Sequence, residues 1–168
     1  MHRWLRLLKH RRLDERDARR LVGDAALQRI EARVAASEAQ HSGEIRVCIE
    51  AGLPLSYVKR GATARERAVA MFAKLRVWDT EDNNGVLIYL LLAEHAIEIV
   101  ADRGLSRHAD AAHWQRVVAT MQAAFQGGQF EAGLNQAVDA VDVLLRQHFA
   151  LAPGEANINE LPNAPYLR

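Results

Sequence analysis

The sequence predicts an α/β protein whose main helices and strands follow the order α-β-α-β-β-α-α. Residues 44–50 alternate between apolar and polar side chains, which is typical of a strand with one buried face. Residues 86–92 form the most apolar run of the chain. Residues 111–126 and 130–149 repeat apolar side chains at helical spacing. Because helices precede and follow the strands, both faces of a small sheet can be covered.

The first long helix is predicted from about residue 25 to residue 41, after a break with a cap at Gly23 and Asp24. The strand at residues 44–50 then places three β-branched side chains on the face that we expect in the core. The side chains of its second face are those of Glu44, Arg46, Cys48 and Glu50. On that face we expect Cys48 to be a small, half-buried residue.

The middle of the chain predicts a crossover helix followed by a hairpin. Thr63 and Glu66 have the spacing of a capping box, so a helix begins there and continues to about Leu75. Residues 86–92 lack polar alternation, which predicts a central strand covered on both faces. A short connection leads to a strand at residues 95–101, and we therefore expect an antiparallel hairpin. The crossover predicts that the first two strands are parallel.

The two C-terminal helices precede a segment of a different composition. Residues 151–168 carry three of the four prolines and show no periodicity. Such a segment is predicted to be an extended or disordered tail.

The composition indicates one globular domain. The net charge is +1, which gives the whole molecule no bias toward nucleic acid. The single cysteine, Cys48, excludes an intramolecular disulfide and fits a reducing compartment. The apolar run at residues 86–92 is far shorter than the ~20 residues of a membrane span, and no signal-peptide pattern is visible. We expect a cytoplasmic protein.

The charge is concentrated at the N-terminus. Residues 1–20 hold eight Lys or Arg against three Asp or Glu, so this arm is basic and the remaining chain is mildly acidic. One interpretation is a short surface helix attracted to anionic lipid or to a partner. The other, commoner, interpretation is a terminal helix that packs its Leu residues on the body. The residues of the arm that would make the contact are Arg3, Trp4, Arg6, Lys9, Arg11 and Arg12.

Five motifs follow one another in an order that resembles the TPM domain, formerly a domain of unknown function. They are HSGEIRV, MFAKLRVW, DNNGVLIYLLL, DRGLS and FQGGQFEAGL, and they cover about residues 24–148. The resemblance implies a three-layer α/β/α sandwich with a mixed central sheet. It divides the chain into a basic arm (1–22), a TPM-like domain (23–150) and a tail (151–168). Relatives are described as acid phosphatases, divalent-metal binders or accessory proteins of membrane complexes.

The best candidates for chemistry are the polar turns on either side of the hairpin. In an antiparallel hairpin, the turn before its first strand and the turn after its second lie at the same end of the sheet. Carboxylate and amide oxygens gathered there would suit calcium or magnesium. The candidate ligands are Asp79, Glu81, Asp82, Asn84 and Asp102. The alternative is turn chemistry alone, in which Asn and Asp bond their own backbone.

The sequence departs from the family pattern at this place. The family has Asp-Asn-Gly where this chain has Asp82-Asn-Asn-Gly, and Asp102-Arg103 stands where many relatives have Gly and an aromatic residue. Arg103 and Arg107 are candidates for holding an anion or a partner, although a solvated pair is the default.

Two functions follow from the sequence. The first is a binding or accessory module for a membrane-associated protein partner, with divalent-metal binding and peripheral contact with anionic lipid as further features. The alternative is a metal-dependent acid phosphatase that uses the acidic turns.

Overall fold

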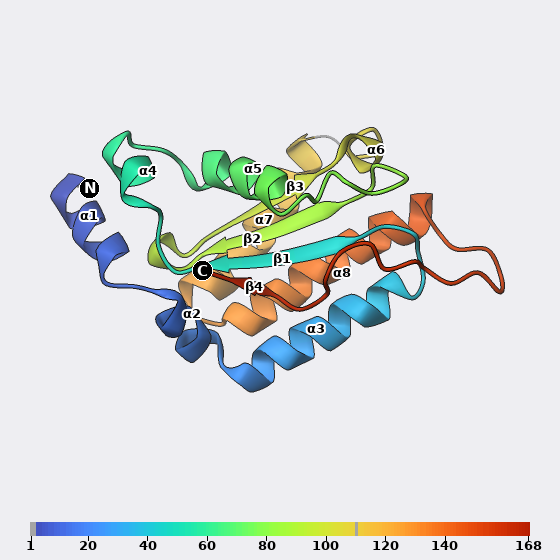
Figure 1. The fold of residues 1–168 in the computed structure, drawn as a ribbon, viewed down its shortest axis with the longest axis horizontal. Coiled ribbons are helices and arrows are strands. Elements are labelled where there is room, and N and C mark those ends of the chain that lie inside the picture. The colour runs from blue at the N-terminus through green and yellow to red at the C-terminus, as the bar shows by residue number, and fades with distance from the viewer. Residues whose placement is uncertain (1–2, 110) are drawn as a thin grey trace.

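The computed structural model describes residues 3–109 and 111–168. Its elements in chain order are α1 (Arg3–Arg11), α2 (Glu15–Val22), α3 (Asp24–Glu38), β1 (Ile45–Glu50), α4 (Leu55–Lys59), α5 (Ala64–Lys74), β2 (Val86–Leu91), the 3-10 helix η1 (Leu92–Glu94), β3 (Ala96–Ala101), α6 (Arg103–Ser106), α7 (Ala111–Gln126), α8 (Phe130–His148) and β4 (Tyr166–Leu167). The predicted order of the long elements is confirmed, with shorter elements between them (Figure 1).

The sheet has the order β3-β2-β1-β4 and is mixed, as predicted. Strands β1 and β2 are parallel, with Ile45 opposite Val86, because the crossover through α4 and α5 returns the chain to the same end. Strands β2 and β3 form the predicted antiparallel hairpin. Strand β4 pairs parallel to β1 at its other edge.

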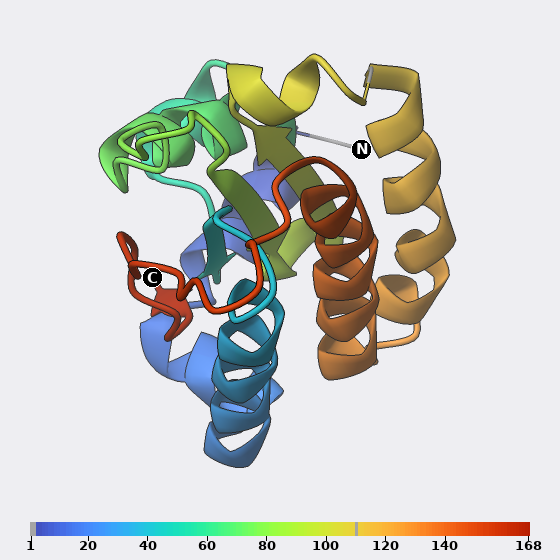
Figure 2. The same ribbon diagram turned by 90° about the vertical axis from the view of Figure 1, so that its right-hand side faces the viewer.

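Two helical layers enclose this sheet, so the fold is a three-layer α/β sandwich. Figure 2 shows α5 on one side of the strands and α3, α7 and α8 on the other. The first core lies under α3, α7 and α8 and contains the three predicted inward residues Ile45, Val47 and Ile49. The second core lies under α4 and α5 and contains Cys48 and Tyr89. Because side chains alternate along each strand, β1 and β2 each contribute residues to both cores.

Local signals in the sequence explain where the crossover helix begins. The capping box is formed: the Glu66 N–H donates to Thr63 Oγ1 at 3.1 Å, and the Thr63 N–H donates to Glu66 Oε2 at 2.8 Å. The hairpin connection is carried by η1 and by His95, which has a left-handed backbone with φ of 49°.

Three expectations differ from the structure. All six residues of β1 are buried, including Cys48, which is fully rather than half buried because residues of α4, α5 and the tail pack on it in the second core. Burial raises the pKa of the Cys48 thiol to about 12. The predicted loop after β1 contains the short helix α4, which starts after Pro54. The predicted tail returns along β1 and ends in β4 (Figure 1).

None of the helices in residues 3–109 and 111–168 combines the length and the apolar character that crossing a membrane requires.

Candidate functional site

The polar turns at the start of β2 and the end of β3 lie against each other, as the hairpin predicts. The Asp102 N–H donates to the carbonyl of Gly85 at 2.9 Å, and the Gly104 N–H donates to the carbonyl of Asn83 at 2.8 Å. These bonds continue the ladder of the hairpin beyond its last strand pair. The two turns therefore form one surface at this end of the sheet.

Close backbone contact at this surface explains one of its glycines. A Cβ atom on Gly104 would lie 2.5 Å from the carbonyl oxygen of Asn83 and 2.6 Å from that of Asp82, so only glycine allows this approach. Within the turn, the Asn84 N–H donates to Thr80 Oγ1 at 3.1 Å, and Asn83 is left-handed with φ of 53°. A left-handed backbone is a conformation that Asn tolerates well in turns, which explains Asn83 at this position.

Three of the predicted ligands gather here. Ser42 Oγ donates to Asp82 Oδ2 at 2.8 Å and accepts from Asn84 Nδ2 at 3.1 Å, so one hydroxyl links the two side chains. Asn84 is fully buried, and its Oδ1 accepts no hydrogen bond from the described residues. Asp102 Oδ1 accepts from the Arg103 N–H at 2.7 Å. The other carboxylate oxygen, Oδ2, is buried and has no hydrogen-bond partner among residues 3–109 and 111–168.

The other two predicted ligands do not join this group. Asp79 is exposed and pairs with Arg76. Glu81 is also exposed, and its N–H donates to Glu160 Oε2 at 3.1 Å. Across residues 3–109 and 111–168, no three side chains of His, Cys, Asp or Glu are grouped closely enough to hold a metal ion. Any cation at the hairpin end would therefore draw on an amide or main-chain oxygens as well.

The two predicted anion-binding residues are exposed. Both Nε and Nη2 of Arg103 donate to Asn83 Oδ1, at 3.0 and 2.9 Å, which places the guanidinium beside the proposed ligands. Arg107 lies at the end of α6 and is exposed.

Sequence reasoning missed Ser42 and Thr80. Ser42 directly follows the predicted helix that ends near residue 41, and no local signal connects it to a turn some forty positions further along the chain. Its main-chain N–H donates to the Phe149 carbonyl at 2.9 Å, so the end of α8 also positions it.

The basic arm packs on the body through one face. Arg6 Nε donates to Glu94 Oε1 at 2.7 Å, and Arg6 Nη2 donates to the carbonyl of Ala62 at 2.6 Å. The buried ring of His10 accepts from the Leu53 N–H at 3.0 Å through Nδ1, so Nε2 carries the proton and donates to Glu94 at 2.9 Å. The hydrogen bond from His10 and, to a smaller extent, the one from Arg6 hold the pKa of the Glu94 carboxyl below its usual range.

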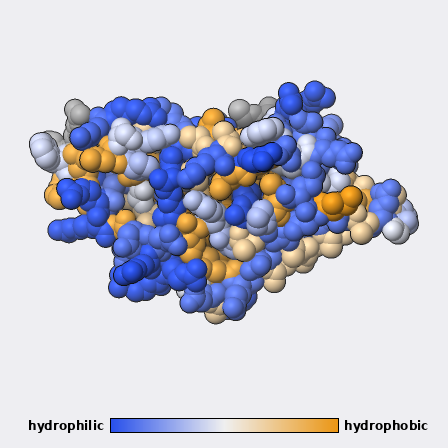
Figure 3. Space-filling view, in the orientation of Figure 1, coloured by the Kyte–Doolittle hydropathy of each residue, from blue (hydrophilic) through white to orange (hydrophobic). Residues whose placement is uncertain are grey.

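The opposite face of α1 is apolar and exposed. Trp4, Leu5 and Leu8 are 78, 58 and 53% exposed. Figure 3 shows apolar surface over α1 and α4 at that end of the molecule. Lys9, Arg11 and Arg12 are exposed around it, while the side chain of Arg3 lies outside the described part of the chain. The expectation of Leu residues on the body holds for the half-buried Leu7, which packs on the second core.

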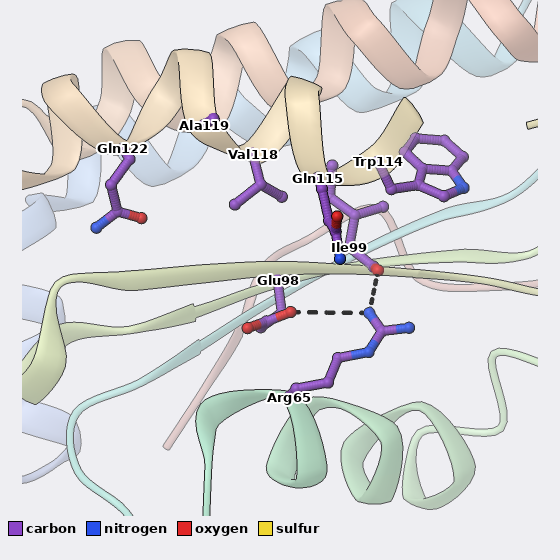
Figure 4. A pocket seen from close by; sticks show the side chains of 8 residues that line it. All are labelled: Arg65, Glu98, Ile99, Trp114, Gln115, Val118, Ala119 and Gln122. Carbon is purple, nitrogen blue, oxygen red and sulfur yellow. Dashed lines mark hydrogen bonds and ion pairs between the residues drawn. The ribbon is translucent and has the colours of Figure 1, made fainter. Parts of the chain in front are cut away.

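A pocket of about 440 Å³ lies at the outer edge of β3, between α5 and α7 (Figure 4). Its apolar wall includes Trp114 and Val118, and Arg65 faces them from α5. Arg65 donates to the carbonyl of Ile99 and lies 3.8 Å from Glu98 Oε2. No pattern in the sequence predicts this pocket, because its residues come from the three separate elements α5, β3 and α7.

A three-layer α/β sandwich with polar turns at one end of a central hairpin is the class of domain that these observations define. The family model for the TPM domain matches residues 16–144. Because this match covers well over half of the 168 residues, the chain belongs to the TPM domain family, and the resemblance seen in the sequence is confirmed.

Two solved structures determined by NMR are similar to the chain. The BA42 protein of the psychrophilic bacterium Bizionia argentinensis has a TM-score of 0.72 and 26% identity, over 86% of this chain and 93% of that one. The N-terminal domain of a P. gingivalis protein has a TM-score of 0.64 and 20% identity, over 79% of this chain and 83% of that one, and it supports the fold alone. No curated protein matches the chain.

Proposed function

We propose that this TPM-domain protein is a non-catalytic accessory module that binds a divalent cation, calcium or magnesium, at the polar end of its central hairpin. The observation that carries the proposal is a pair of buried oxygens without a hydrogen-bond donor among the described residues, Asn84 Oδ1 and Asp102 Oδ2. Both belong to residues at the junction of the two turns, beside Asp82.

The physical reason is the cost of an unsatisfied oxygen. A buried acceptor without a donor costs about 1–3 kcal/mol, and a carboxylate costs more. A hard cation removes that cost, since calcium and magnesium prefer carboxylate, amide and main-chain oxygens. Asp82, Asn84 and Asp102 would supply side-chain ligands. The main-chain carbonyls of Asp82 and Asn83, which face Gly104, are of the same chemical type.

Calorimetric titration with calcium and with magnesium tests the site. We expect the wild type to bind at millimolar concentration or below, and a double variant Asp82→Ala/Asp102→Ala to lose at least ten-fold in affinity. The matched control is Asp79→Ala/Glu81→Ala, which removes the same charge from the same turn but leaves the buried oxygens in place. Wild-type protein that binds neither ion at millimolar concentration would overturn the proposal, and so would equal losses in the two double variants.

We further propose that α1 brings the module to an anionic membrane surface on the cytoplasmic side, where its protein partner resides. Supporting this are the three exposed apolar side chains of α1 and the exposed basic residues around them. Aromatic and Leu side chains enter the lipid interface while Lys and Arg attract anionic headgroups.

Co-sedimentation with phosphatidylcholine vesicles, with and without phosphatidylserine, tests the arm. The wild type is expected to pellet several-fold more with phosphatidylserine than without it. The variant Trp4→Ala/Leu5→Ala/Leu8→Ala should lose this difference, whereas Val143→Ala/Ile158→Ala, exposed apolar residues elsewhere, should keep it. Equal pelleting of the wild type and the α1 variant would show that α1 does not bind the vesicles and would contradict this proposal.

A metal-dependent acid phosphatase is the second candidate, and the position of Arg103 favours it. An exposed guanidinium beside Asp102 and Asn83 suits a phosphate oxygen, and a cation next to it would polarise the ester. The test is hydrolysis of p-nitrophenyl phosphate at mildly acid pH with calcium or magnesium. Metal-dependent hydrolysis that falls at least ten-fold in Arg103→Met supports this candidate, and no metal-dependent hydrolysis eliminates it.

A further inference from the structure

The C-terminal tail lies on the sheet as a bound peptide does. The Ala51 N–H donates to the Arg168 carbonyl at 2.7 Å, and the Arg168 N–H donates to the Ile49 carbonyl at 3.0 Å. The strand pairing covers only two residues of the tail, Tyr166 and Leu167. Addition of an extended segment to an open strand edge is a common mode of peptide recognition, in which main-chain bonds give affinity and side-chain contacts give specificity.

Charged side chains at the edge of β1 hold the main chain of the tail. Arg46 Nη1 donates to the carbonyl of Pro162 at 2.6 Å and also to that of Ala164. Glu44 Oε2 accepts from the Leu161 N–H at 3.1 Å, and its Oε1 accepts from Asn157 Nδ2 at 3.1 Å. Both charged residues are buried under the tail. Burial accordingly raises the pKa of the Glu44 carboxyl and lowers that of the Arg46 guanidinium.

The charges of Glu44 and Arg46 are unusual at the start of a strand inside a sheet. A permanently interior strand is normally apolar on both faces, whereas Lys, Arg and Glu on a sheet edge keep that edge soluble when it is uncovered. Glu44 and Arg46 lose their tail partners but regain water if the tail leaves. Charged side chains at this edge are therefore compatible with water when the edge is uncovered.

Few side chains of the tail are anchored. Leu161 is buried in the second core, and Tyr166 and Leu167 pack partly against the cores. Between α3 and residues 155–163 lies a polar hollow of about 330 Å³. Glu38 Oε2 and Asn163 Oδ1 are buried there without a partner among the described residues. A segment with three apolar anchors over a loosely filled hollow is poorly suited to act as a fixed part of the core.

We propose that the edge of β1 is a docking site for an extended peptide, that residues 155–168 are its resident occupant, and that a segment of a partner protein with the same anchors displaces them. The anchors are a Leu-Pro pair followed after three residues by Tyr-Leu-Arg. The leucine enters the second core, Arg46 donates to the carbonyls of Pro162 and Ala164 that follow it, and Tyr166 and Leu167 pair parallel to β1. The terminal arginine also approaches Glu50, with Arg168 Nε 3.5 Å from Glu50 Oε1. This proposal does not depend on the proposed cation site, which the tail contacts only through Glu160 and the Glu81 N–H among the hydrogen bonds of the described residues.

Peptide exchange in the full chain tests this site. A protease recognition sequence is placed in the exposed stretch around Gly154, and the purified protein is cut there, which leaves the tail held only by its contacts. A fluorescent peptide of residues 155–168 is then added, and its anisotropy is measured. We expect saturable binding to the cut protein and at least 100-fold weaker binding to uncut protein, because the tethered tail competes at millimolar effective concentration.

Matched variants locate the binding. Arg46→Met in the cut protein is expected to weaken the labelled peptide at least ten-fold, and so is a peptide with Ala at positions 166 and 167. Arg65→Met, a guanidinium that binds a main-chain carbonyl at the opposite edge of the sheet, should leave binding unchanged. Failure of the labelled peptide to exchange, unfolding of the protein on cutting, or equal binding by Arg46→Met and wild type would each overturn the proposal.

Hydrogen exchange gives a second readout on the uncut wild type. The amides of Ala51 and Arg168, which join the tail to the edge, should exchange at least ten-fold faster than the Val86 amide, which bonds the Glu44 carbonyl inside the sheet. Equal protection of these amides would show that the tail opens only with the whole domain, and would contradict the proposal.

Discussion

The two edges of the sheet leave the same backbone groups open and satisfy them differently. At the β1 edge a strand from the tail provides main-chain partners, with Arg46 and Glu44 extending the contact. At the β3 edge, individual side chains donate hydrogen bonds to the open main-chain carbonyls. Gln122 Nε2 donates to the His95 carbonyl at 2.9 Å, Ser106 Oγ donates to the Ala101 carbonyl at 3.1 Å, and Arg65 donates to the carbonyl between them, that of Ile99.

This difference separates an edge that accepts a strand from an edge that refuses one. Side chains bound to the carbonyls of Ile99 and Ala101 in β3, and of His95 just before it, occupy positions where an incoming strand would donate. The β1 edge instead offers a main-chain ladder and the Arg46 guanidinium, which bind the carbonyls of an extended segment, while the second core takes its leucine. Of the two edges, the β1 edge is thus the one that suits an extended peptide.

The largest expected effect comes from the buried ion pair at the end of β1. Arg67 Nε and Nη2 each donate to the Glu50 carboxylate at 2.8 Å, and Tyr89 donates to it at 2.7 Å. Arg67→Met leaves that carboxylate buried and underpaired, so we expect a loss of about 3–5 kcal/mol in the free energy of unfolding, measured in urea. A loss below about 1 kcal/mol would show that water or Arg168 replaces Arg67.

Removing the apolar anchor of the tail should have the next largest effect. Leu161→Ala deletes a buried side chain from the second core and is expected to cost about 2–3 kcal/mol in the same measurement. Ile158→Ala, an exposed apolar residue of the same tail, should change the stability by less than about 0.5 kcal/mol. Equal effects would mean that the tail is not anchored at Leu161.

An effect of about 1 kcal/mol for each pH unit should appear in the pH dependence of stability. Burial raises the pKa of the Glu38 carboxyl to about 8 in the folded protein, and the unfolded chain has the ordinary value near 4.5. Because the folded state holds this proton more tightly, its contribution is fully present below pH about 4.5 and is lost as pH rises through about 8. Glu38→Gln should remove a decrease of roughly 1 kcal/mol per pH unit in that window.

The measurement is urea unfolding of wild type and Glu38→Gln across that range of pH. The difference between the two proteins isolates Glu38 from His41, whose pKa is lowered by burial and which therefore favours the folded state as pH rises. Parallel profiles for the two proteins would refute the assignment.

The smallest effect is expected at the β3 edge. Arg65→Met removes a half-exposed cap from one carbonyl, which water can then reach, so the stability should fall by less than about 1 kcal/mol. Dimer formation by this variant in analytical ultracentrifugation would strengthen the distinction between the two edges. It would show that Arg65, bound to the Ile99 carbonyl, prevents β3 from pairing with a strand of another molecule. A loss as large as that of Arg67→Met would contradict the division between the two edges.

The parts of the fold that depend on local patterns could be predicted from the sequence. Alternation located β1, the apolar run located β2, and the Thr63 and Glu66 pair located the start of α5. Strand β4 could not be predicted, because a two-residue strand in a Pro-rich segment has no period and its partner lies far away in the chain. The burial of Glu44 and Arg46 could not be predicted for the same reason, because it is the tail that covers them.

The candidate site was predictable to the extent that the hairpin determines it. Antiparallel pairing brings Asp82, Asn84 and Asp102 to one end, and this needs no tertiary information. The directions of Asp79 and Glu81 depend on a turn that contains the left-handed residues Arg76 and Asn83, which the pattern of residues does not reveal. Whether the three oxygens bind a cation, and whether α1 contacts lipid, stay predictions for the experiments above.

The position of β4 also bears on how the chain folds. The hairpin of β2 and β3 closes over a few residues and belongs to the fast local events of folding, whereas β4 must find β1 across most of the chain. For that interval the nascent sheet has a bare edge, the kind that joins neighbouring chains into aggregates. Glu44 and Arg46 place charges beside that edge, and charges of this kind disfavour non-specific aggregation of an uncovered strand.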